Sequence, residues 1–296
     1  MTSTEDSWTV GRLLSWTIDY LGKHGAENPR LEAEVLLAHA RNCRRIDLYT
    51  TFGDTASEDT RTAFRELVKR RAGGTPVAYL VGHREFYSLD FEVTPDVLIP
   101  RPETESLVVA LLDHAKPRSA ADTAIEIADV GTGSGILAVC AAKFLPAARV
   151  TAIDISRDAL AVAKRNAERH NVADRIAFVE SDLFTAVPVD ARFDYIVSNP
   201  PYVSNSEMQQ LPLDVRDYEP EIALRAGENG TDVIAPLIEQ SAERLQPAGG
   251  LFIEISPMVV EAVEKLVAAQ SSLELGPTIK DLAGLARIVQ ATRRDC

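Results

Sequence analysis

The stretch Asp129-Val-Gly131-Thr-Gly133-Ser-Gly135 decides the fold class of this 296-residue chain. It follows an apolar run over residues 124–130 that predicts a β-strand, and it opens a helical pattern over 134–144. Glycines at this point allow a tight turn and a close approach of the backbone to a ligand. The spacing differs from a dinucleotide fingerprint, because Ile136 stands where the last glycine would be, and no Gly-Lys-Ser/Thr of a P-loop follows. A strand-to-helix turn without a ligand is the alternative interpretation.

Outward from this loop, predicted strands and helices alternate through the rest of the chain. This order predicts an α/β domain with a mostly parallel, doubly wound sheet, in which ligands bind at the carboxyl ends of the strands. The predicted strands span residues 124–130, 149–154, 176–180, 193–198, 251–255 and 285–291. The predicted helices span residues 102–115, 134–144, 156–171, 232–245 and 257–269.

The N-terminal part has a different pattern, which is helical throughout. Apolar residues recur at helix spacing over 10–21, a second helix begins at Asn28-Pro29, and a third begins near Thr55, with Glu58 at capping-box spacing. Apolar and polar residues then alternate over 89–93, as in a strand or hairpin. We therefore predict a helical domain over residues 1–75, a β-hairpin connector over 76–99, and the α/β domain over 100–296.

Composition excludes several classes of protein. The three cysteines, Cys43, Cys140 and Cys296, are far apart and form no Cys-x-x-Cys pair, so neither a disulfide framework nor a zinc site is indicated. The N-terminus lacks the charge pattern of a signal peptide, and no apolar run approaches the ~18 residues of a membrane span. We expect a cytoplasmic protein that binds no metal and no membrane.

Charge is unevenly distributed along the chain, whose formal net charge is −13. Residues 1–95 carry 14 acidic and 12 basic side chains, whereas residues 96–296 carry 30 acidic and 19 basic ones. An acidic α/β domain repels the phosphate backbone of DNA or RNA. We therefore do not expect a nucleic acid as the substrate.

Two acidic residues follow the next two predicted strands. Asp154 ends its strand 19 residues after Gly135, a distance at which a carboxylate accepts hydrogen bonds from ribose hydroxyls. Its alternative role is that of a helix N-cap, but Ser156 can take that role and leave Asp154 free. Asp182 can accept from an exocyclic adenine amine, with Leu183 or Phe184 packed on the ring. Together with the glycine loop, these residues predict an adenosine pocket without a pyrophosphate cradle, which suits S-adenosyl-L-methionine.

The tetrapeptide Asn199-Pro200-Pro201-Tyr202 follows the strand predicted over 193–198. Two consecutive prolines fix the backbone and remove two donors, so the Asn199 side chain, the Pro200 carbonyl and the Tyr202 ring stand on a rigid platform. Two acceptors there would orient a planar NH2 group and favour positive charge developing on its nitrogen, while the tyrosine stacks on the plane. An ordinary Asn-Pro turn is the alternative.

These motifs resemble those of a class I S-adenosyl-methionine-dependent methyltransferase, and two further strings narrow the resemblance. The strings are Gly74-Thr-Pro-Val-Ala-Tyr-Leu-Val-Gly82 with Arg84-Glu85-Phe86, and Leu98-Ile-Pro-Arg-Pro-Glu-Thr-Glu105. Both are similar to the HemK/PrmC family, which methylates the glutamine of the Gly-Gly-Gln motif in peptide chain release factors. The resemblance covers nearly the whole chain. It implies a seven-stranded, Rossmann-like sheet, a helical domain that recognises the substrate, and release factors as protein partners.

The resemblance also implies residue roles. The glycine loop would hold the methionine part of the cofactor, Asp154 the ribose, and Asp182 and Leu183 the adenine. The implied cofactor residues are Gly131, Thr132, Gly133, Ser134, Gly135, Asp154, Asp182, Leu183 and Asn199. The implied catalytic residues are Asn199, Pro200 and Tyr202, and the implied substrate contacts are Asn199, Pro200, Pro201, Tyr202, Arg101 and Thr104. The string Glu254-Ile-Ser-Pro257 departs from the family, which usually has a glycine after the Glu-x pair.

Two other functions compete with this interpretation. An adenine-N6 DNA or RNA methyltransferase can use the same tetrapeptide on a flipped base, but it would need a basic recognition region. A non-catalytic binding module with a degenerate pocket is the second alternative, and the intact Gly131, Asp154 and Asn199 argue against it. We expect the protein to be a monomer.

Overall fold

The computed structural model describes residues 7–119, 124–281 and 283–295, and the chain divides into two compact units. The first unit comprises Met1–Gly82 together with Leu213–Tyr218. The second comprises His83–Pro212 and Glu219–Cys296. The predicted connector over 76–99 is therefore divided, because its first seven residues belong to the helical unit and the rest belongs to the sheet unit.

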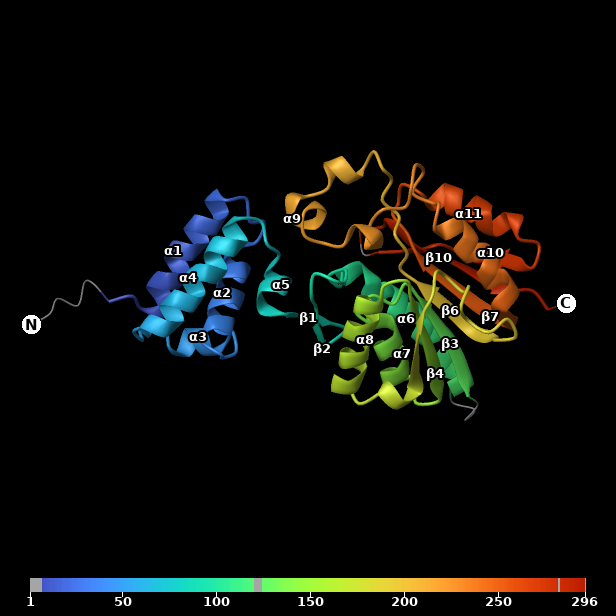
Figure 1. Ribbon diagram of the computed structural model, residues 1–296, viewed down its shortest axis with the longest axis horizontal. Helices are drawn as coiled ribbons and strands as arrows, with labels where there is room; N and C mark the ends of the chain where they lie inside the picture. The colour runs from blue at the N-terminus through green and yellow to red at the C-terminus, as the bar shows by residue number, and fades with distance from the viewer. Residues whose placement is uncertain (1–6, 120–123, 282, 296) are drawn as a thin grey trace, which may run out of the picture. The chain divides into compact units, whose positions relative to one another are not determined.

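The first unit is a bundle of helices around a core of its own (Figure 1). Its helices are α1 (Val10–Lys23), α2 (Pro29–Ala40), α3 (Asp47–Thr50), α4 (Glu58–Ala72), α5 (Val77–Val81) and α9 (Leu213–Arg216). Leu36, Leu37 and Phe64 are among its buried side chains, which explains the helical spacing of apolar residues in this part of the sequence. The predicted capping box at Thr55 is wrong. Ser57 is the N-cap of α4, and its side chain accepts from Thr60 N at 3.2 Å.

A segment distant in sequence completes this unit. Arg71 of α4 forms an ion pair with Glu32 at 2.7 Å and lies 3.8 Å from Asp214 of α9. The Tyr218 hydroxyl donates to the Gly73 carbonyl at 2.8 Å. Because Gly74 has φ +101° and a Cβ there would lie 3.2 Å from the Tyr218 ring, a side chain at this position would be strained and crowded. Residues 213–218 therefore belong to the helical unit and contact its other residues.

The second unit is an α/β sandwich around one mixed sheet. Its strand order is β5-β4-β3-β6-β7-β10-β8, with the short β9 also paired to β10. The strands from β5 to β7 run parallel, and β10 runs antiparallel to its partners, as predicted for a mostly parallel sheet. The strands are β3 (Ile125–Val130), β4 (Ala148–Asp154), β5 (Ile176–Glu180), β6 (Phe193–Ser198), β7 (Leu245–Glu254), β8 (Leu273–Leu275), β9 (Ile279–Lys280) and β10 (Ala286–Arg293).

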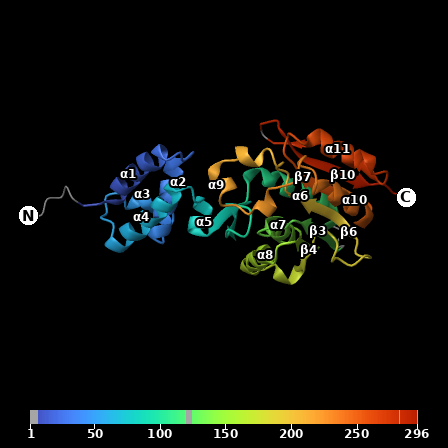
Figure 2. The same cartoon turned by 45° about the horizontal axis from the view of Figure 1, so that its top comes forward.

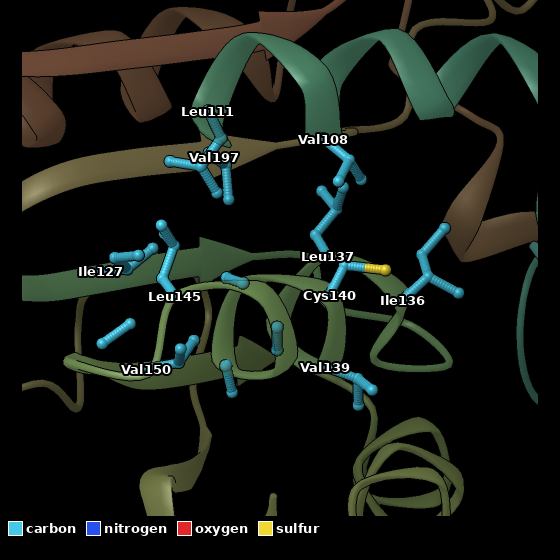
Figure 3. Close-up of a cluster of buried hydrophobic side chains, with 14 of the residues drawn as sticks. Val108, Leu111, Ile127, Ile136, Leu137, Val139, Cys140, Leu145, Val150 and Val197 are labelled. Atoms are coloured by element: carbon cyan, nitrogen blue, oxygen red, sulfur yellow. The ribbon is translucent and has the colours of Figure 1, made fainter. Parts of the chain in front are cut away.

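Helices cover both faces of this sheet (Figure 2). Along β3, Ile127 packs into a cluster with α6 and α7, whereas Ala128 packs into a second cluster with α10 and α11, as alternation in a strand requires. Figure 3 shows the first cluster, in which Leu137 and Cys140 of α7 lie near Val108 of α6. The helices are α6 (Glu105–Ser119), α7 (Ile136–Phe144), α8 (Arg157–Arg169), α10 (Ile234–Arg244) and α11 (Val260–Ala269), with short 3-10 turns η2 (Pro102–Thr104), η3 (Ala173–Arg175), η4 (Met208–Gln210) and η5 (Glu221–Ala223).

The predicted hairpin is formed by β1 (His83–Phe86) and β2 (Leu89–Glu92), which pair antiparallel. Tyr87 and Ser88 both have positive φ, +50° and +59°, as a tight two-residue hairpin turn requires. The buried Asn166 of α8 fixes the hairpin to the sheet unit, because it accepts from Glu92 N at 2.7 Å and donates to the Glu92 carbonyl at 3.0 Å. Within the described parts of the chain, no helix is long and apolar enough to span a membrane.

Candidate active site

A cavity of about 530 Å³ lies at the carboxyl ends of β3, β4, β5 and β6. All of its lining residues belong to the sheet unit. It is bordered by the glycine loop after β3, the acidic residues after β4 and β5, the start of the tetrapeptide after β6, and residues from 96–104 and 220–225. This is the edge at which open α/β sheets bind ligands, so three of the predicted motifs meet in one place.

The glycine loop forms one wall of the cavity. Gly131, Gly133 and Gly135 have φ values of +74°, +55° and +82°, which L-residues with side chains rarely adopt. A Cβ on Gly135 would lie 3.0 Å from Ala163 Cβ, so this glycine also allows α7 and α8 to pack closely. The Ser134 carbonyl accepts from Asn166 Nδ2 at 2.8 Å, which joins the loop to α8. Thr132 and Ser134 complete the wall.

Asp129, the first residue of the quoted stretch, lies beneath the loop and is fully buried. Its Oδ2 accepts from the Thr132 hydroxyl at 2.6 Å and from Ala138 N at 3.0 Å. Its Oδ1 has no hydrogen-bond partner within the described residues. Burial raises the pKa of Asp129 to about 7, with a further contribution from the nearby charge of Asp154. The buried carboxyl group of Asp129 therefore holds the glycine loop and the start of α7 in place through these two hydrogen bonds.

Asp154 holds two loops together at the end of β4. Its Oδ2 accepts from Gly133 N at 2.8 Å, and its Oδ1 accepts from Ser156 N at 2.9 Å. Ser156 is the N-cap of α8 and accepts from Ala159 N at 3.1 Å, as predicted. The expectation that this would leave Asp154 free is wrong, since both carboxylate oxygens already accept backbone donors. Each oxygen keeps a second lone pair for a ligand. Burial raises the Asp154 pKa, against the hydrogen bonds.

Asp182 and Leu183, which are predicted to bind adenine, line the cavity, and so does Ile155. Phe184, the other candidate for packing on the ring, is 1% exposed and packs in the core against Phe193 instead. Ile155 was missed by the sequence analysis, although an apolar residue directly after Asp154 was the available signal. It is 51% exposed, which is unusual for isoleucine and leaves an apolar surface for a flat ring.

The tetrapeptide after β6 is only partly at the cavity. Asn199 and Pro201 line it, whereas Pro200 and Tyr202 are not among the lining residues. Asn199 Nδ2 donates to the Thr104 hydroxyl at 3.3 Å. Tyr202 packs beside the apolar cluster under α10 and α11, and burial raises its pKa to about 12. The structure thus brings Asn199 to the site and leaves the ring of Tyr202 outside the cavity.

The segment 98–104 also lines the cavity, with Arg101 and Thr104 among its lining residues. Arg101 forms an ion pair with Glu219, whose carboxylate also accepts from Ile99 N at 3.1 Å. Glu219 is buried and follows the segment 213–218 directly. Glu219 was not predicted from the sequence, because its partners lie about 120 positions away, although the run Glu219-Pro-Glu221 was a visible signal. Glu219 thus holds Arg101 and the backbone at Ile99 in place at the cavity.

Glu254, at the end of β7, was singled out only as a departure from a pattern. It is buried, and its pKa is raised to about 7 by burial, while a hydrogen bond from Thr104 opposes that rise. Its Oε2 has no hydrogen-bond partner among the residues that the structure describes. In the same described part, no group of three potential ligands could hold a metal ion.

Comparison with known proteins agrees with this fold. Residues 12–82 match the PrmC N-terminal domain, and residues 107–213 match the methyltransferase small domain. The fold is similar to that of solved methyltransferase structures. One is the 16S rRNA N2 G1207 methyltransferase of Thermus thermophilus, which is 20% identical in sequence with a TM-score of 0.54. The match covers 72% of this chain and 50% of that chain. Another is the hMettl16 catalytic domain, which is 15% identical with a TM-score of 0.55. The match covers 77% of this chain and 82% of that chain.

The fold and the matched domain define a class I methyltransferase that uses S-adenosyl-L-methionine. The release factor glutamine methyltransferase of Rhodopirellula baltica is 50% identical over 288 residues, covering 97% of each chain. That of Geobacter sulfurreducens is 40% identical over 289 residues, covering 98% of each. This chain therefore belongs to the release factor glutamine methyltransferase family.

Proposed function

We propose that this enzyme transfers a methyl group from S-adenosyl-L-methionine to the side-chain amide nitrogen of the glutamine in the Gly-Gly-Gln motif of peptide chain release factors. The observation that carries the proposal is the position of Asn199 at the wall of the cavity, with its Nδ2 turned to Thr104. This leaves Asn199 Oδ1 as an acceptor for an incoming N–H group. Family membership supports the same substrate.

The residues around the cavity suit the cofactor. Backbone of the glycine loop from Gly131 to Gly135 would hold the methionine part, Asp154 would accept from the ribose hydroxyls, and Asp182 with Leu183 would bind the adenine. An apolar shelf at Ile155 and an acceptor at Asp182 match the face and the edge of adenine. When bound, the cofactor supplies an electrophilic methyl group on a sulfonium.

The chain's own groups then have to make a poor nucleophile react. The lone pair of an amide nitrogen is delocalised, so the nitrogen gains nucleophilicity only as positive charge is stabilised on it. Asn199, which lines the cavity, supplies through Oδ1 the acceptor that we assign to one N–H bond. The Pro200 carbonyl, next in the chain, is the acceptor that we assign to the other, although Pro200 is not among the lining residues. Pro201 fixes the turn that presents them. No protein base is required, because the nitrogen becomes acidic once it is alkylated.

Arg101 and Thr104 are proposed to border the substrate entrance. Arg101 is held by Glu219, so its guanidinium keeps a fixed place beside the cavity. Tyr202 is proposed to support the tetrapeptide and not to stack on the substrate amide, because it does not line the cavity and its partly buried ring packs against the apolar cluster with α10 and α11. This changes the role inferred from the sequence while keeping the residue in the site.

The helical unit is proposed to recognise the release factor, and the sheet unit to carry out the transfer. All residues that line the cavity belong to the sheet unit, so the helical unit is free for another task. The net charge of −13 supports a protein substrate over a nucleic acid. A cytoplasmic location and a monomeric state remain part of the proposal.

The decisive experiment offers the enzyme labelled S-adenosyl-L-methionine with three acceptors: a release factor, the same factor with the Gly-Gly-Gln glutamine changed to alanine, and a DNA duplex with adenine sites. We expect label only in the intact factor. Transfer to DNA would indicate an adenine-N6 methyltransferase, and transfer to neither would indicate a binding module. Label in the alanine variant would show that another residue is the acceptor.

A further inference from the structure

Three side chains from three elements meet behind the tetrapeptide. Asn199 follows β6, Thr104 ends the turn η2, and Glu254 ends β7. Asn199 Nδ2 donates to Thr104 Oγ1 at 3.3 Å, and the Thr104 side chain lies close enough to the Glu254 carboxyl group to lower its pKa against the effect of burial. Thr104 and Glu254 are both buried, so water does not compete for these groups.

The hydroxyl of Thr104 carries a single proton, and this decides which way the Asn199 amide faces. While Glu254 is ionised it can only accept, so Thr104 must give it that proton. The oxygen of Thr104 can then only accept from Asn199, which turns Nδ2 toward Thr104 and Oδ1 toward the cavity. If Glu254 could not accept, the Thr104 proton would be free to bind Oδ1, and the amide could turn over.

We propose that Glu254 is a positioning residue for methyl transfer, which acts through the Thr104 hydroxyl to keep the Asn199 carbonyl oxygen directed at the substrate amide. This inference rests on the proposed function, because it assigns a cause to the orientation that the reaction needs. With the amide reversed, Asn199 would present an NH2 group to the NH2 group of the substrate, and the acceptor would be lost.

The burial of Glu254 supports a functional role over a structural one. An unpaired Oε2 in a buried carboxylate costs free energy that an apolar side chain of the same size would avoid. Other charges face Glu254 from each neighbouring element: Glu103 from η2 and Arg101 before it, Arg287 from β10, and the Tyr202 ring from the tetrapeptide. Burial raises the pKa of Glu254 to about 7, so protonation falls within the range of an enzyme assay.

The test compares Glu254→Met, Thr104→Val and Thr104→Ser in the full chain, with the exposed Glu274→Gln as the control. Methionine matches glutamate in size and removes the acceptor. We expect Glu254→Met to lower kcat for a Gly-Gly-Gln release factor by about tenfold or more, the scale of a misoriented catalytic group. Affinity for S-adenosyl-homocysteine should stay within about twofold of wild type, because the cofactor contacts are untouched. The melting temperature should stay equal or rise.

Two further readouts separate positioning from a merely structural role. The wild-type kcat should fall as pH drops below about 7, and this acid limb should be absent in Glu254→Met. Thr104→Val should lower kcat to the same extent as Glu254→Met, and Thr104→Ser should keep kcat close to that of wild type. The double variant Glu254→Met with Thr104→Val should have the same kcat as Thr104→Val alone, because both substitutions act through one hydroxyl.

The inference is overturned if Glu254→Met keeps the wild-type kcat and acid limb, if it loses cofactor affinity in proportion to rate, or if the two substitutions multiply. Should Glu254→Met fail to fold, the Thr104 pair decides: full activity in Thr104→Val overturns the inference, and a loss that Thr104→Ser rescues supports it. Absence of transfer by the wild-type enzyme would overturn the proposed function and this inference with it. Wild-type transfer beside an unimpaired Glu254→Met would overturn the inference alone.

Discussion

Gly133 N donates a hydrogen bond of 2.8 Å to Asp154 Oδ2, and this contact ties the glycine loop after β3 to the end of β4. The same carboxylate accepts from Ser156 N through its other oxygen. A single side chain thus sets the distance between the two loops that we assign to the methionine and ribose parts of the cofactor. We therefore propose that Asp154 acts in binding both directly and structurally, because it shapes the glycine loop that it also borders.

Asp154→Ala should weaken binding of S-adenosyl-homocysteine by about 1.5–3 kcal/mol, the scale of hydrogen bonds to a charged group. Asp154→Asn should weaken it as well, since an asparagine amide cannot accept from both Gly133 N and Ser156 N. Isothermal titration calorimetry measures this directly, with the exposed Asp190→Asn as the matched control. Unchanged affinity in both Asp154 variants would remove this residue from the cofactor site.

The stability of the sheet unit should depend on pH through Asp129. Because burial raises its folded-state pKa to about 7 from the ordinary value of 3.8, the native state binds a proton that the unfolded state has released between these values. This contribution to the free energy of unfolding is complete at low pH and is lost as pH rises toward and through about 7. Asp129→Asn keeps the shape and removes the titration.

The measurement is chemical denaturation of wild type and Asp129→Asn from pH 5 to pH 8. The variant should gain stability relative to wild type as the pH rises, while Asp190→Asn should follow wild type at every pH. Comparing the two proteins at each pH cancels groups of opposite sign, such as Asp281, whose pKa is lowered by Arg287. Parallel curves for Asp129→Asn and wild type would contradict the assigned titration.

Deleting residues 1–82 should preserve cofactor binding and abolish transfer to an intact release factor. The reason is that all residues lining the cavity lie in the sheet unit, whereas the deletion removes all of the helical unit, the proposed recognition surface, except residues 213–218. A short Gly-Gly-Gln peptide should remain a weak substrate, and its methylation is the control for a working active site. Normal transfer to the intact factor would show that the helical unit is not needed for recognition.

The sequence predicted the local parts of the structure well, because these depend on near neighbours. The glycine loop and the cap at Ser156 follow from spacing over a few residues, and they are where they were expected. The capping box predicted at Thr55 is wrong because Ser57, two residues later, is an equally suitable N-cap, and the helix begins after it. Local patterns thus identify elements more reliably than their first residues.

Partners distant in the chain could not be predicted. Glu219 meets Arg101, and Glu254 lies close to Thr104, only because the fold brings together segments that are distant in the sequence. Nothing in the spacing of residues 213–218 indicated that this segment completes the helical unit, where Tyr218 binds the Gly73 carbonyl. Phe184 was a plausible ring for the adenine, and only its side-chain direction, which depends on core packing, decided against it.

Asn199→Ala should remove most activity while leaving cofactor affinity nearly unchanged. Our proposal is that Asn199 orients the substrate amide and stabilises positive charge that grows only in the transition state, and losing one such preorganised group typically costs ~10²–10³ in turnover. Single-turnover methyl transfer to a release factor measures the rate, and titration with S-adenosyl-homocysteine measures the affinity. If alanine loses rate and affinity equally, Asn199 belongs to the cofactor site, and if it loses neither, the tetrapeptide is only a turn.

Asn199→Asp is the sharper probe of the same residue. It keeps an acceptor for the substrate, so it should retain more activity than alanine if acceptance is the main role. It cannot donate to Thr104, however, and its charge lies in the network that includes Glu254, so proton uptake there should become easier. The acid limb of its pH profile should therefore move to higher pH than in wild type. Activity at or below that of alanine at every pH would show that Asn199 acts as a donor and that the proposed orientation of its amide is reversed.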